Sequence, residues 1–216
     1  LVLFSGSGSV EQQLARMFPR SVIISLDIDP KSAATHCQDI LQFVQTDMFQ
    51  YAPGDFDLIW ASPPCTEYSR AMTTRPRRLD TADTLVSAAI SAMVYLQPKY
   101  WYIENPVGML QHRPLMQPFE PYRHTASYCH YGSPSRKDTN VWTNALVPPL
   151  SLCRTITPCA QKAHLGRHLQ TAQAGPSRNA TGSGPGKNVY HIPAALLNRL
   201  FQPLQAQTRV DQALNR

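Results

Sequence analysis

The abrupt end of one apolar run constrains the fold of this chain more than any other sequence feature. Residues 58–61 form an apolar run typical of a buried strand, and Ser-Pro-Pro follows at 62–64. Because proline lacks a backbone N–H and has a fixed φ, two successive prolines end the strand there. The next residue is Cys65. A thiol just beyond a strand's carboxyl end occupies the place where open α/β sheets bind ligands, so Cys65 is either a nucleophile or a small buried apolar residue.

Predicted strands and helices alternate along the first part of the chain. We expect strands over residues 1–4, 22–28, 43–46, 58–61 and 100–103. We expect helices over residues 10–18, directly after Pro30, and over 81–96, where apolar residues recur at helical spacing. Two further strands, over 125–131 and 140–145, can pair antiparallel. This order predicts an α/β fold with a mostly parallel, doubly wound sheet and an antiparallel terminal strand.

Glycine or acidic residues follow the other predicted strands. Gly6 and Gly8 lie between the first strand and the first helix, an arrangement typical of nucleotide-binding domains. Later strands end at the acids Asp27, Asp47 and Glu104. Because the carboxyl ends of parallel strands meet at one edge of a sheet, we expect these residues and Cys65 to share one ligand-binding edge.

Size, charge and cysteine content limit the functional classes. A chain of 216 residues with 43% hydrophobic residues suits one domain with a substantial core. The net charge of +6 favours a polyanionic partner such as nucleic acid. Five cysteines without a framework spacing favour a reduced intracellular setting, cytoplasm or nucleus, over a disulfide scaffold. The absence of a secretory leader or long apolar run predicts no membrane partner. The start at Leu1, directly in a strand, indicates an upstream segment.

An arginine-rich stretch follows Cys65. Residues 67–80 have no regular periodicity and carry Arg70, Arg75, Arg77 and Arg78. Such a stretch is either a solvated loop or a flap that closes on phosphate groups. The neighbouring candidate nucleophile favours the flap.

The composition changes near residue 148, which predicts three parts: a catalytic domain over 1–147, a small irregular recognition segment over 148–187, and a C-terminal part over 188–216. The middle segment is rich in proline, glycine, serine and threonine, with a low-complexity loop over 174–186. Its residues Cys153, Cys159, His164 and His168 form either a loose zinc cluster or scattered polar positions. Residues 193–201 have the pattern of an amphipathic helix that packs back on the core, followed by a tail that frays.

Taken together, these features resemble the carbon-5 cytosine DNA methyltransferases. The motifs that carry the resemblance are LFSGSGS (3–9), SLDID (25–29), TDMF (46–49), SPPCTEYS (62–69), IENP (103–106) and YGSPSRKDTNVW (131–142). The resemblance implies a Rossmann-like fold that binds S-adenosylmethionine and transfers its methyl group to cytosine in DNA.

The chemistry of that reaction accounts for the residue types. Carbon 5 of cytosine is a weak nucleophile, so a thiolate first adds to carbon 6 while an acid at ring nitrogen 3 absorbs the developing charge. The resemblance assigns the thiolate to Cys65 and the acid to Glu104. Arg136 and Lys137 stand where the family carries basic residues, and complete the predicted catalytic set.

The resemblance also implies the binding residues. Phe4, Gly6 and Gly8 would surround the methionine part of the cofactor, with Pro63 nearby. Asp27, followed by Ile28, would bind the ribose hydroxyls, and Asp47 with Met48 the adenine. The predicted nucleic-acid contacts are Ser69, Arg70, Arg75, Arg77 and Arg78.

Two departures from the family pattern stand out. Thr139 occupies a position where the family has an arginine, so contacts to the base or its phosphate must be partly rearranged. The family's large target-recognition domain is replaced by the short segment over 148–187, as in virus- or phage-type enzymes.

Three alternatives remain open from the sequence. An amino methyltransferase has an aromatic residue after the two prolines, where this chain has Cys65. The same covalent chemistry on RNA or a free cytidine nucleotide is compatible with the missing domain, although the basic loop favours a polymer. The third is a catalytically idle nucleic-acid-binding module with a zinc knuckle, and the presence of both Cys65 and Glu104 argues against it.

Overall fold

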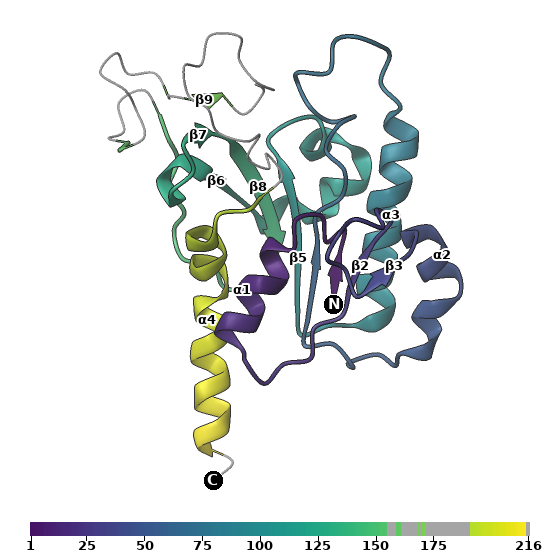
Figure 1. The fold of residues 1–216 in the computed structure, drawn as a ribbon, viewed down its shortest axis with the longest axis vertical. Helices are drawn as coiled ribbons and strands as arrows, with labels where there is room; N and C mark the ends of the chain where they lie inside the picture. The colour runs from purple at the N-terminus through teal and green to yellow at the C-terminus, as the bar shows by residue number, and fades with distance from the viewer. Residues whose placement is uncertain (155–158, 161–167, 169, 172–190, 215–216) are drawn as a thin grey trace.

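Seven strands form one large sheet in the computed structural model, which describes residues 1–154, 159–160, 168, 170–171 and 191–214. The strands are β1 (Val2–Leu3), β2 (Ser25–Asp27), β3 (His36–Cys37), β4 (Leu58–Ala61), β5 (Tyr100–Pro106), β6 (Arg123–Ser127) and β8 (Asp138–Thr143). Their spatial order is β3-β2-β1-β4-β5-β8-β6 (Figure 1). Strand β8 runs antiparallel to both of its neighbours, β5 and β6, and all other neighbouring strands pair in parallel. The predicted α/β class with a mostly parallel sheet is confirmed, and the antiparallel strand is the last of this sheet along the chain.

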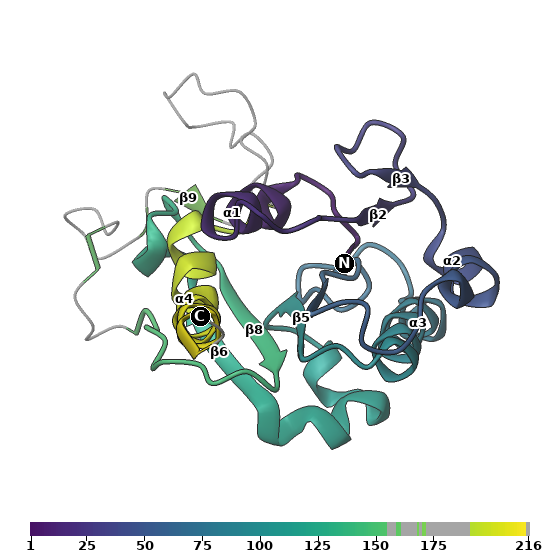
Figure 2. The same ribbon diagram turned by 90° about the horizontal axis from the view of Figure 1, so that it is seen from below.

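Helices cover both faces of the sheet. The α-helices are α1 (Ser9–Met17), α2 (Ile40–Gln45), α3 (Leu79–Leu96) and α4 (Ala194–Leu214). Short 3-10 helices are η1 (Asp47–Gln50), η2 (Leu110–His112), η3 (Pro114–Tyr122) and η4 (Tyr128–Tyr131). The sheet separates α1 and α4 from α2 and α3 (Figure 2). The predicted doubly wound arrangement follows from these two covered faces.

Side-chain alternation along the central strands divides the core into two clusters. In β4, Ile59 packs toward α2 and α3, whereas Trp60 packs toward α1 and α4. In β5, Ile103 likewise packs toward α2 and α3, and Tyr102 packs toward α1 and α4. Because successive side chains of a strand point to opposite faces, a run of consecutive apolar residues is what a strand buried on both faces requires.

The C-terminal helix α4 packs on the α1 side of the sheet. Its residues Leu196, Leu197, Leu200 and Phe201 are buried, and Gln13 of α1 donates to Asn198 Oδ1 at 2.6 Å. The helix continues past Pro203 to Leu214, so the predicted end near residue 201 is wrong. The low-complexity loop over 174–186 lies outside the described residues.

The predicted strand over 43–46 is wrong, because this segment belongs to α2. Asp39 caps the helix by accepting a hydrogen bond from the backbone N–H of Leu41 at 2.9 Å. Ile40 and Phe43, three positions apart, then face the core together, which is helical rather than strand spacing. The corresponding strand is β3, so Asp47 opens η1 instead of ending a strand.

Three other boundaries differ from the prediction. Strand β2 is shorter than residues 22–28, because Val22 and Ile28 are 89% and 67% exposed. Turns and bends occupy the residues after Pro30, where we expected a helix. Strand β5 continues to Pro106 because β8 pairs with it across Glu104.

Helix α3 has the length and composition of a membrane-spanning helix, and it is the only such helix among the described residues. Core helices of water-soluble proteins meet the same criterion. Here Val86, Ala89 and Leu96 of α3 are fully buried in the cluster between this helix and the sheet.

Candidate active site

The loop after β4 holds Cys65 at the carboxyl edge of the sheet. The side-chain amide of Asn105, which is fully buried in β5, donates to the carbonyl oxygen of Pro63 at 2.8 Å. Tyr68 donates its hydroxyl to Asp83 of α3 at 2.8 Å. A Cβ at Gly108 would lie 2.4 Å from the carbonyl oxygen of Tyr68, so only glycine permits this close approach. These contacts fix the loop on both sides of a half-buried Cys65.

Glu104 is buried in β5, with two hydroxyl groups on one carboxylate oxygen. Its Oε1 accepts hydrogen bonds from the Tyr128 hydroxyl at 2.9 Å and from the Thr139 hydroxyl. Thr139 pairs with Pro106, and Pro106 and Glu104 point to the same face because they are two positions apart. Thr139 is thus a diagonal cross-strand neighbour of Glu104.

Tyr128 is a functional candidate that the sequence analysis missed. It lies in η4, and the same burial that hides its ring raises the pKa of its phenol well above the usual value, assisted by the Glu104 carboxylate. Tyr128 therefore remains a hydrogen-bond donor at neutral pH. It lies in the middle of the predicted strand over 125–131, so the sequence pattern did not mark it as a strand end. In the structure β6 ends at Ser127, which places Tyr128 directly after a strand end.

The positive charge of Lys137 acts on both Tyr128 and Cys65. Its Nζ is 4.8 Å from the centre of the Tyr128 ring. Burial raises the pKa of the Cys65 thiol, the Lys137 charge lowers that pKa, and the Glu104 carboxylate raises it. Lys137 thus favours the thiolate that a nucleophilic role requires.

Arg136, the second predicted basic residue, has a different environment. It belongs to the short strand β7 (Ser135–Arg136), which pairs in parallel with β9 (Gln170–Thr171). Its guanidinium forms an ion pair with Asp138 at 2.9 Å, and the resulting hydrogen bond raises the pKa of Arg136. The structure places Arg136 in this pair.

The predicted cofactor residues gather around the loop between β1 and α1. Gly6 and Gly8 have φ values of 53° and 68°, and Phe4 shares this left-handed conformation with φ of 60°. The Asp27 carboxylate accepts the backbone N–H groups of Gly6 at 2.7 Å and Asp29 at 2.8 Å. The exposed Ile28 side chain follows it.

These residues fit S-adenosylmethionine. A left-handed glycine loop before a helix lets the backbone approach a ligand closely, and a carboxylate at the next strand end suits ribose hydroxyls. The exposed Ile28 offers an apolar surface to an adenine ring.

The remaining predicted cofactor residues differ in exposure. Asp47 is half-buried, and its carboxylate accepts a hydrogen bond from Gln38. Met48 is 4% exposed and packs in the core beside α2, so its side chain is a core component. Pro63 is buried, with its carbonyl oxygen bound by Asn105.

The four arginines of the loop after Cys65 divide into two pairs. Arg77 donates to the carbonyl oxygens of Glu67 and Ser69, each at 2.7 Å, and to that of Met72 at 2.9 Å. Arg75 forms an ion pair with the Glu67 carboxylate. These two side chains hold the loop in shape.

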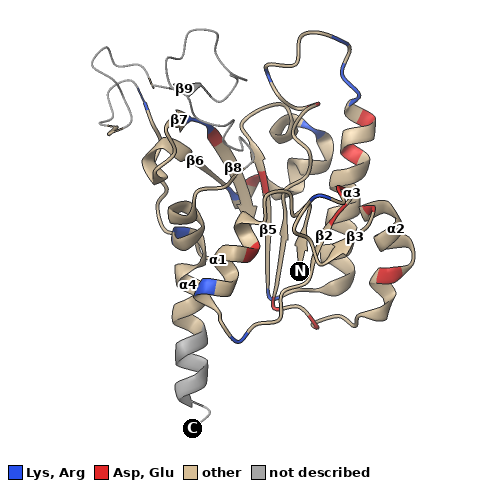
Figure 3. Cartoon of the chain, viewed as in Figure 1, with Lys and Arg blue, Asp and Glu red and all other residues tan. Residues whose placement is uncertain are grey.

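Arg70 and Arg78 are both exposed, and Figure 3 shows the basic residues on the loop that leads into α3. The prediction that this loop contacts phosphate groups therefore rests mainly on Arg70 and Arg78. Ser69 is half-buried at the base of the loop.

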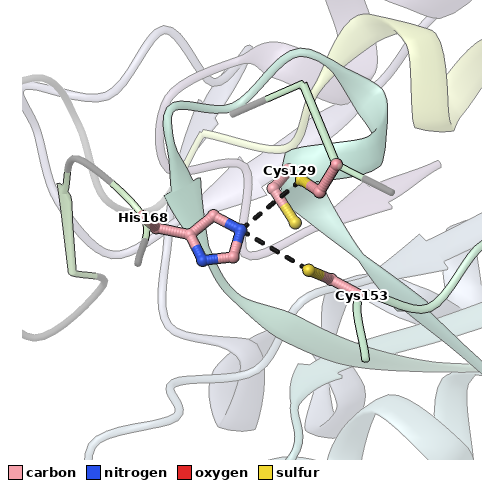
Figure 4. Close-up of side chains that lie close together, drawn as sticks. Cys129, Cys153 and His168 are labelled. Atoms are coloured by element: carbon pink, nitrogen blue, oxygen red, sulfur yellow. Dashed lines mark hydrogen bonds between the residues drawn. The ribbon is translucent and has the colours of Figure 1, made fainter. Parts of the chain in front are cut away.

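A second cluster of chemically active side chains lies near η4. Cys129, Cys153, Cys159 and His168 place their ligand atoms within 4.8 Å of one another, an arrangement that could hold a metal ion (Figure 4). The structure brings together three of the four predicted ligands. The fourth prediction, His164, lies outside the described residues. Cys129 was missed because it belongs to the catalytic part of the chain, 24 positions before Cys153 (153 − 129 = 24).

Comparison with known proteins gives the family of this chain and two similar proteins. Residues 1–119 match the family described as C-5 cytosine-specific DNA methylase. The probable DNA (cytosine-5)-methyltransferase of frog virus 3 (isolate Goorha) is 27% identical over 220 residues, covering 93% of this chain and 97% of that protein. A crystal structure of a putative DNA modification methyltransferase encoded within an E. coli prophage has a TM-score of 0.48 and 19% identity, covering 66% of this chain and 44% of that one.

Proposed function

Because the chain belongs to the family of C-5 cytosine-specific DNA methylases, we propose that it transfers a methyl group from S-adenosylmethionine to carbon 5 of cytosine in DNA. The observation that carries this proposal is the pairing of β4 with β5, which sets the Cys65 loop beside Glu104. Asn105, directly after Glu104, is hydrogen-bonded to Pro63, two residues before Cys65. The nucleophile and the acid are therefore tied to each other through adjacent residues.

The reaction begins at the base. The Cys65 thiolate adds to carbon 6 of cytosine, while Glu104 provides a proton to ring nitrogen 3, so that carbon 5 becomes an enamine carbon able to attack a methyl group. S-adenosylmethionine, when bound, supplies that methyl group as a sulfonium. Water then takes the carbon 5 proton, the Cys65 sulfur leaves as a thiolate, and the proton on ring nitrogen 3 returns to Glu104, which restores the aromatic ring.

Tyr128 and Thr139 position Glu104 for this proton transfer. Both hydroxyls donate to Oε1, which leaves Oε2 to face ring nitrogen 3. In the family resemblance, an arginine occupies the position of Thr139. We therefore propose that the Tyr128 and Thr139 hydroxyls orient Glu104 in place of that arginine. Because both donors are neutral, they do not favour the ionised carboxylate as an arginine charge would.

We expect Lys137→Met to shift the titration of Cys65 to higher pH. Thiolate forms as the pH rises through the pKa, and Lys137 lowers that pKa, so removal of its charge raises the pKa and reduces the thiolate at any given pH. The measurement is the rate of iodoacetamide labelling of Cys65 against pH, resolved by peptide mass spectrometry. Lys137→Arg, which keeps the charge, should stay close to wild type. Identical midpoints for Lys137→Met and wild type would remove Lys137 from this role.

We expect Asp27→Ala to weaken S-adenosylmethionine binding about tenfold or more, because a charged acceptor contributes about 1.5–3 kcal/mol. The same change frees the backbone N–H of Gly6, which adds to the loss. Isothermal titration calorimetry measures the affinity directly. Glu104→Gln is the matched control, because Glu104 lies on a different strand from the predicted cofactor residues. It should bind S-adenosylmethionine with wild-type affinity. An unchanged affinity in Asp27→Ala would refute the cofactor assignment of the glycine loop.

The proposed activity is tested by offering labelled S-adenosylmethionine together with DNA, RNA or deoxycytidine nucleotide. We expect label at carbon 5 of cytosine in DNA, identified by nucleoside mass spectrometry. Label in RNA or the nucleotide alone would keep the covalent chemistry and change the substrate. No label in any substrate, with intact binding to nucleic acid, would identify an idle binding module.

A further inference from the structure

We propose that Cys129, Cys153, Cys159 and His168 bind one structural zinc ion, which fastens the segment after residue 148 to the wall of the base-binding site. The four ligand atoms lie within 4.8 Å of one another. Nε2 of His168 is 3.5 Å from the sulfur of Cys153 and 3.5 Å from the sulfur of Cys159. Figure 4 shows the His168 ring directed at the sulfur atoms.

The two sulfur–nitrogen distances of 3.5 Å match an edge of a zinc tetrahedron. Zinc–sulfur bonds of about 2.3 Å and zinc–nitrogen bonds of about 2.0–2.1 Å, at tetrahedral angles, separate sulfur from nitrogen by about 3.5 Å. The donor set of three thiols and one imidazole is typical of closed structural zinc sites, and soft sulfur ligands disfavour magnesium and calcium. Because four protein ligands complete the tetrahedron, this ion would have no open position for catalysis.

The ligands come from separate parts of the chain. Cys129 lies in η4 of the catalytic part, and Cys153 is buried where the chain leaves that part. Cys159 and His168 lie farther along, and His168 precedes β9, which pairs with β7. With few large apolar side chains, residues 153–171 cannot form a core of their own. A metal ion that joins them to η4 supplies the missing stabilisation.

The cluster is directly connected to the residues around Glu104. Cys129 follows Tyr128, whose hydroxyl binds Glu104 and whose backbone N–H donates to the carbonyl oxygen of Lys137 at 2.9 Å. The backbone N–H of Cys153 donates to Ser127 Oγ at 2.8 Å. Zinc would therefore fix both ends of the Tyr128 backbone, on the wall that carries Lys137. The consequence for catalysis rests on the proposed function, whereas the zinc site itself does not.

The first test is the zinc content of the purified protein by elemental analysis. We expect about one zinc per chain in the wild type and less than a tenth of that in Cys159→Ser and His168→Ala. Cys37→Ser removes an exposed cysteine in β3, outside the cluster, and should retain the full content. Replacement of zinc by cobalt(II) should give the visible absorption of a tetrahedral thiolate site. A wild-type protein that holds less than a tenth of an equivalent, and takes up no zinc on titration, would overturn the proposal, as would full zinc content in both ligand variants.

The second test separates the zinc site from the proposed reaction. Removal of zinc should increase hydrogen exchange in peptides that cover 123–137 and leave exchange in peptides that cover 2–27 unchanged. The zinc-free protein should bind S-adenosylmethionine with the same affinity as the zinc-loaded protein. Methyl transfer should then fall about tenfold or more, because small displacements of positioning groups are costly. Unchanged exchange near Tyr128 would refute the fastening role. A holoprotein with one zinc and no methyl transfer would refute the proposed function and leave the zinc site standing.

Discussion

Replacement of Cys65 by alanine should abolish methyl transfer to DNA and leave S-adenosylmethionine affinity within about twofold of wild type. Alanine removes the sulfur that adds to carbon 6, and without that bond carbon 5 cannot attack the methyl group. The loss should be on the order of 10⁴-fold or more, as for other nucleophiles of covalent catalysis. The cofactor residues around Gly6 and Asp27 belong to other strand ends, so the substitution leaves them intact. Single-turnover transfer and calorimetry measure the two effects separately.

The matched control for this variant is Cys37→Ala, at the exposed edge strand β3. It should transfer methyl groups at the wild-type rate. Full turnover by Cys65→Ala would contradict the covalent mechanism, and a large loss of cofactor affinity would show that the loop after β4 belongs to the cofactor site instead.

Replacement of Glu104 by glutamine should reduce the single-turnover rate by about 10²–10⁴-fold, the usual contribution of a general acid. Glutamine has nearly the same shape, and its carbonyl oxygen can still accept from Tyr128 and Thr139, so the strand should keep its structure. The amide cannot release a proton to ring nitrogen 3. DNA affinity, measured by fluorescence anisotropy, should remain within a few-fold of wild type.

Tyr128→Phe is the companion to Glu104→Gln. It removes one donor to Oε1 and leaves the carboxyl group in place, so its rate should fall less than that of Glu104→Gln. Equal losses of rate and DNA affinity in Glu104→Gln would assign Glu104 to binding or to structure.

The elements around the strand ends could be predicted because local pattern determines them. Two prolines end β4 whatever the rest of the chain does, and the helical spacing of small apolar residues predicts α3. Residues 43–46 misled the prediction because four residues are too few to separate helical from strand periodicity. The cap at Asp39 was the decisive local signal.

Contacts between distant parts of the chain escaped prediction. Cys65 and Glu104 were found because each follows an apolar strand. Thr139 reaches Glu104 only through the register of β5 with β8, and a shift of one residue would turn its hydroxyl to the other face. Cys129 joins Cys153 only because the chain returns to η4 after residue 148, which no spacing rule encodes.

The most direct test of the central claim is the reaction with DNA that contains 5-fluorocytosine in the presence of S-adenosylmethionine. Fluorine at carbon 5 blocks the final proton loss, so Cys65 cannot leave after methyl transfer. We predict a stable complex whose mass exceeds the sum of protein and oligonucleotide by one CH2 unit, because a methyl group is gained and the thiol proton is lost. The link should map to the Cys65 peptide and be absent in Cys65→Ala. Methylation of ordinary cytosine without a trapped complex, or a link at another residue, would contradict the account.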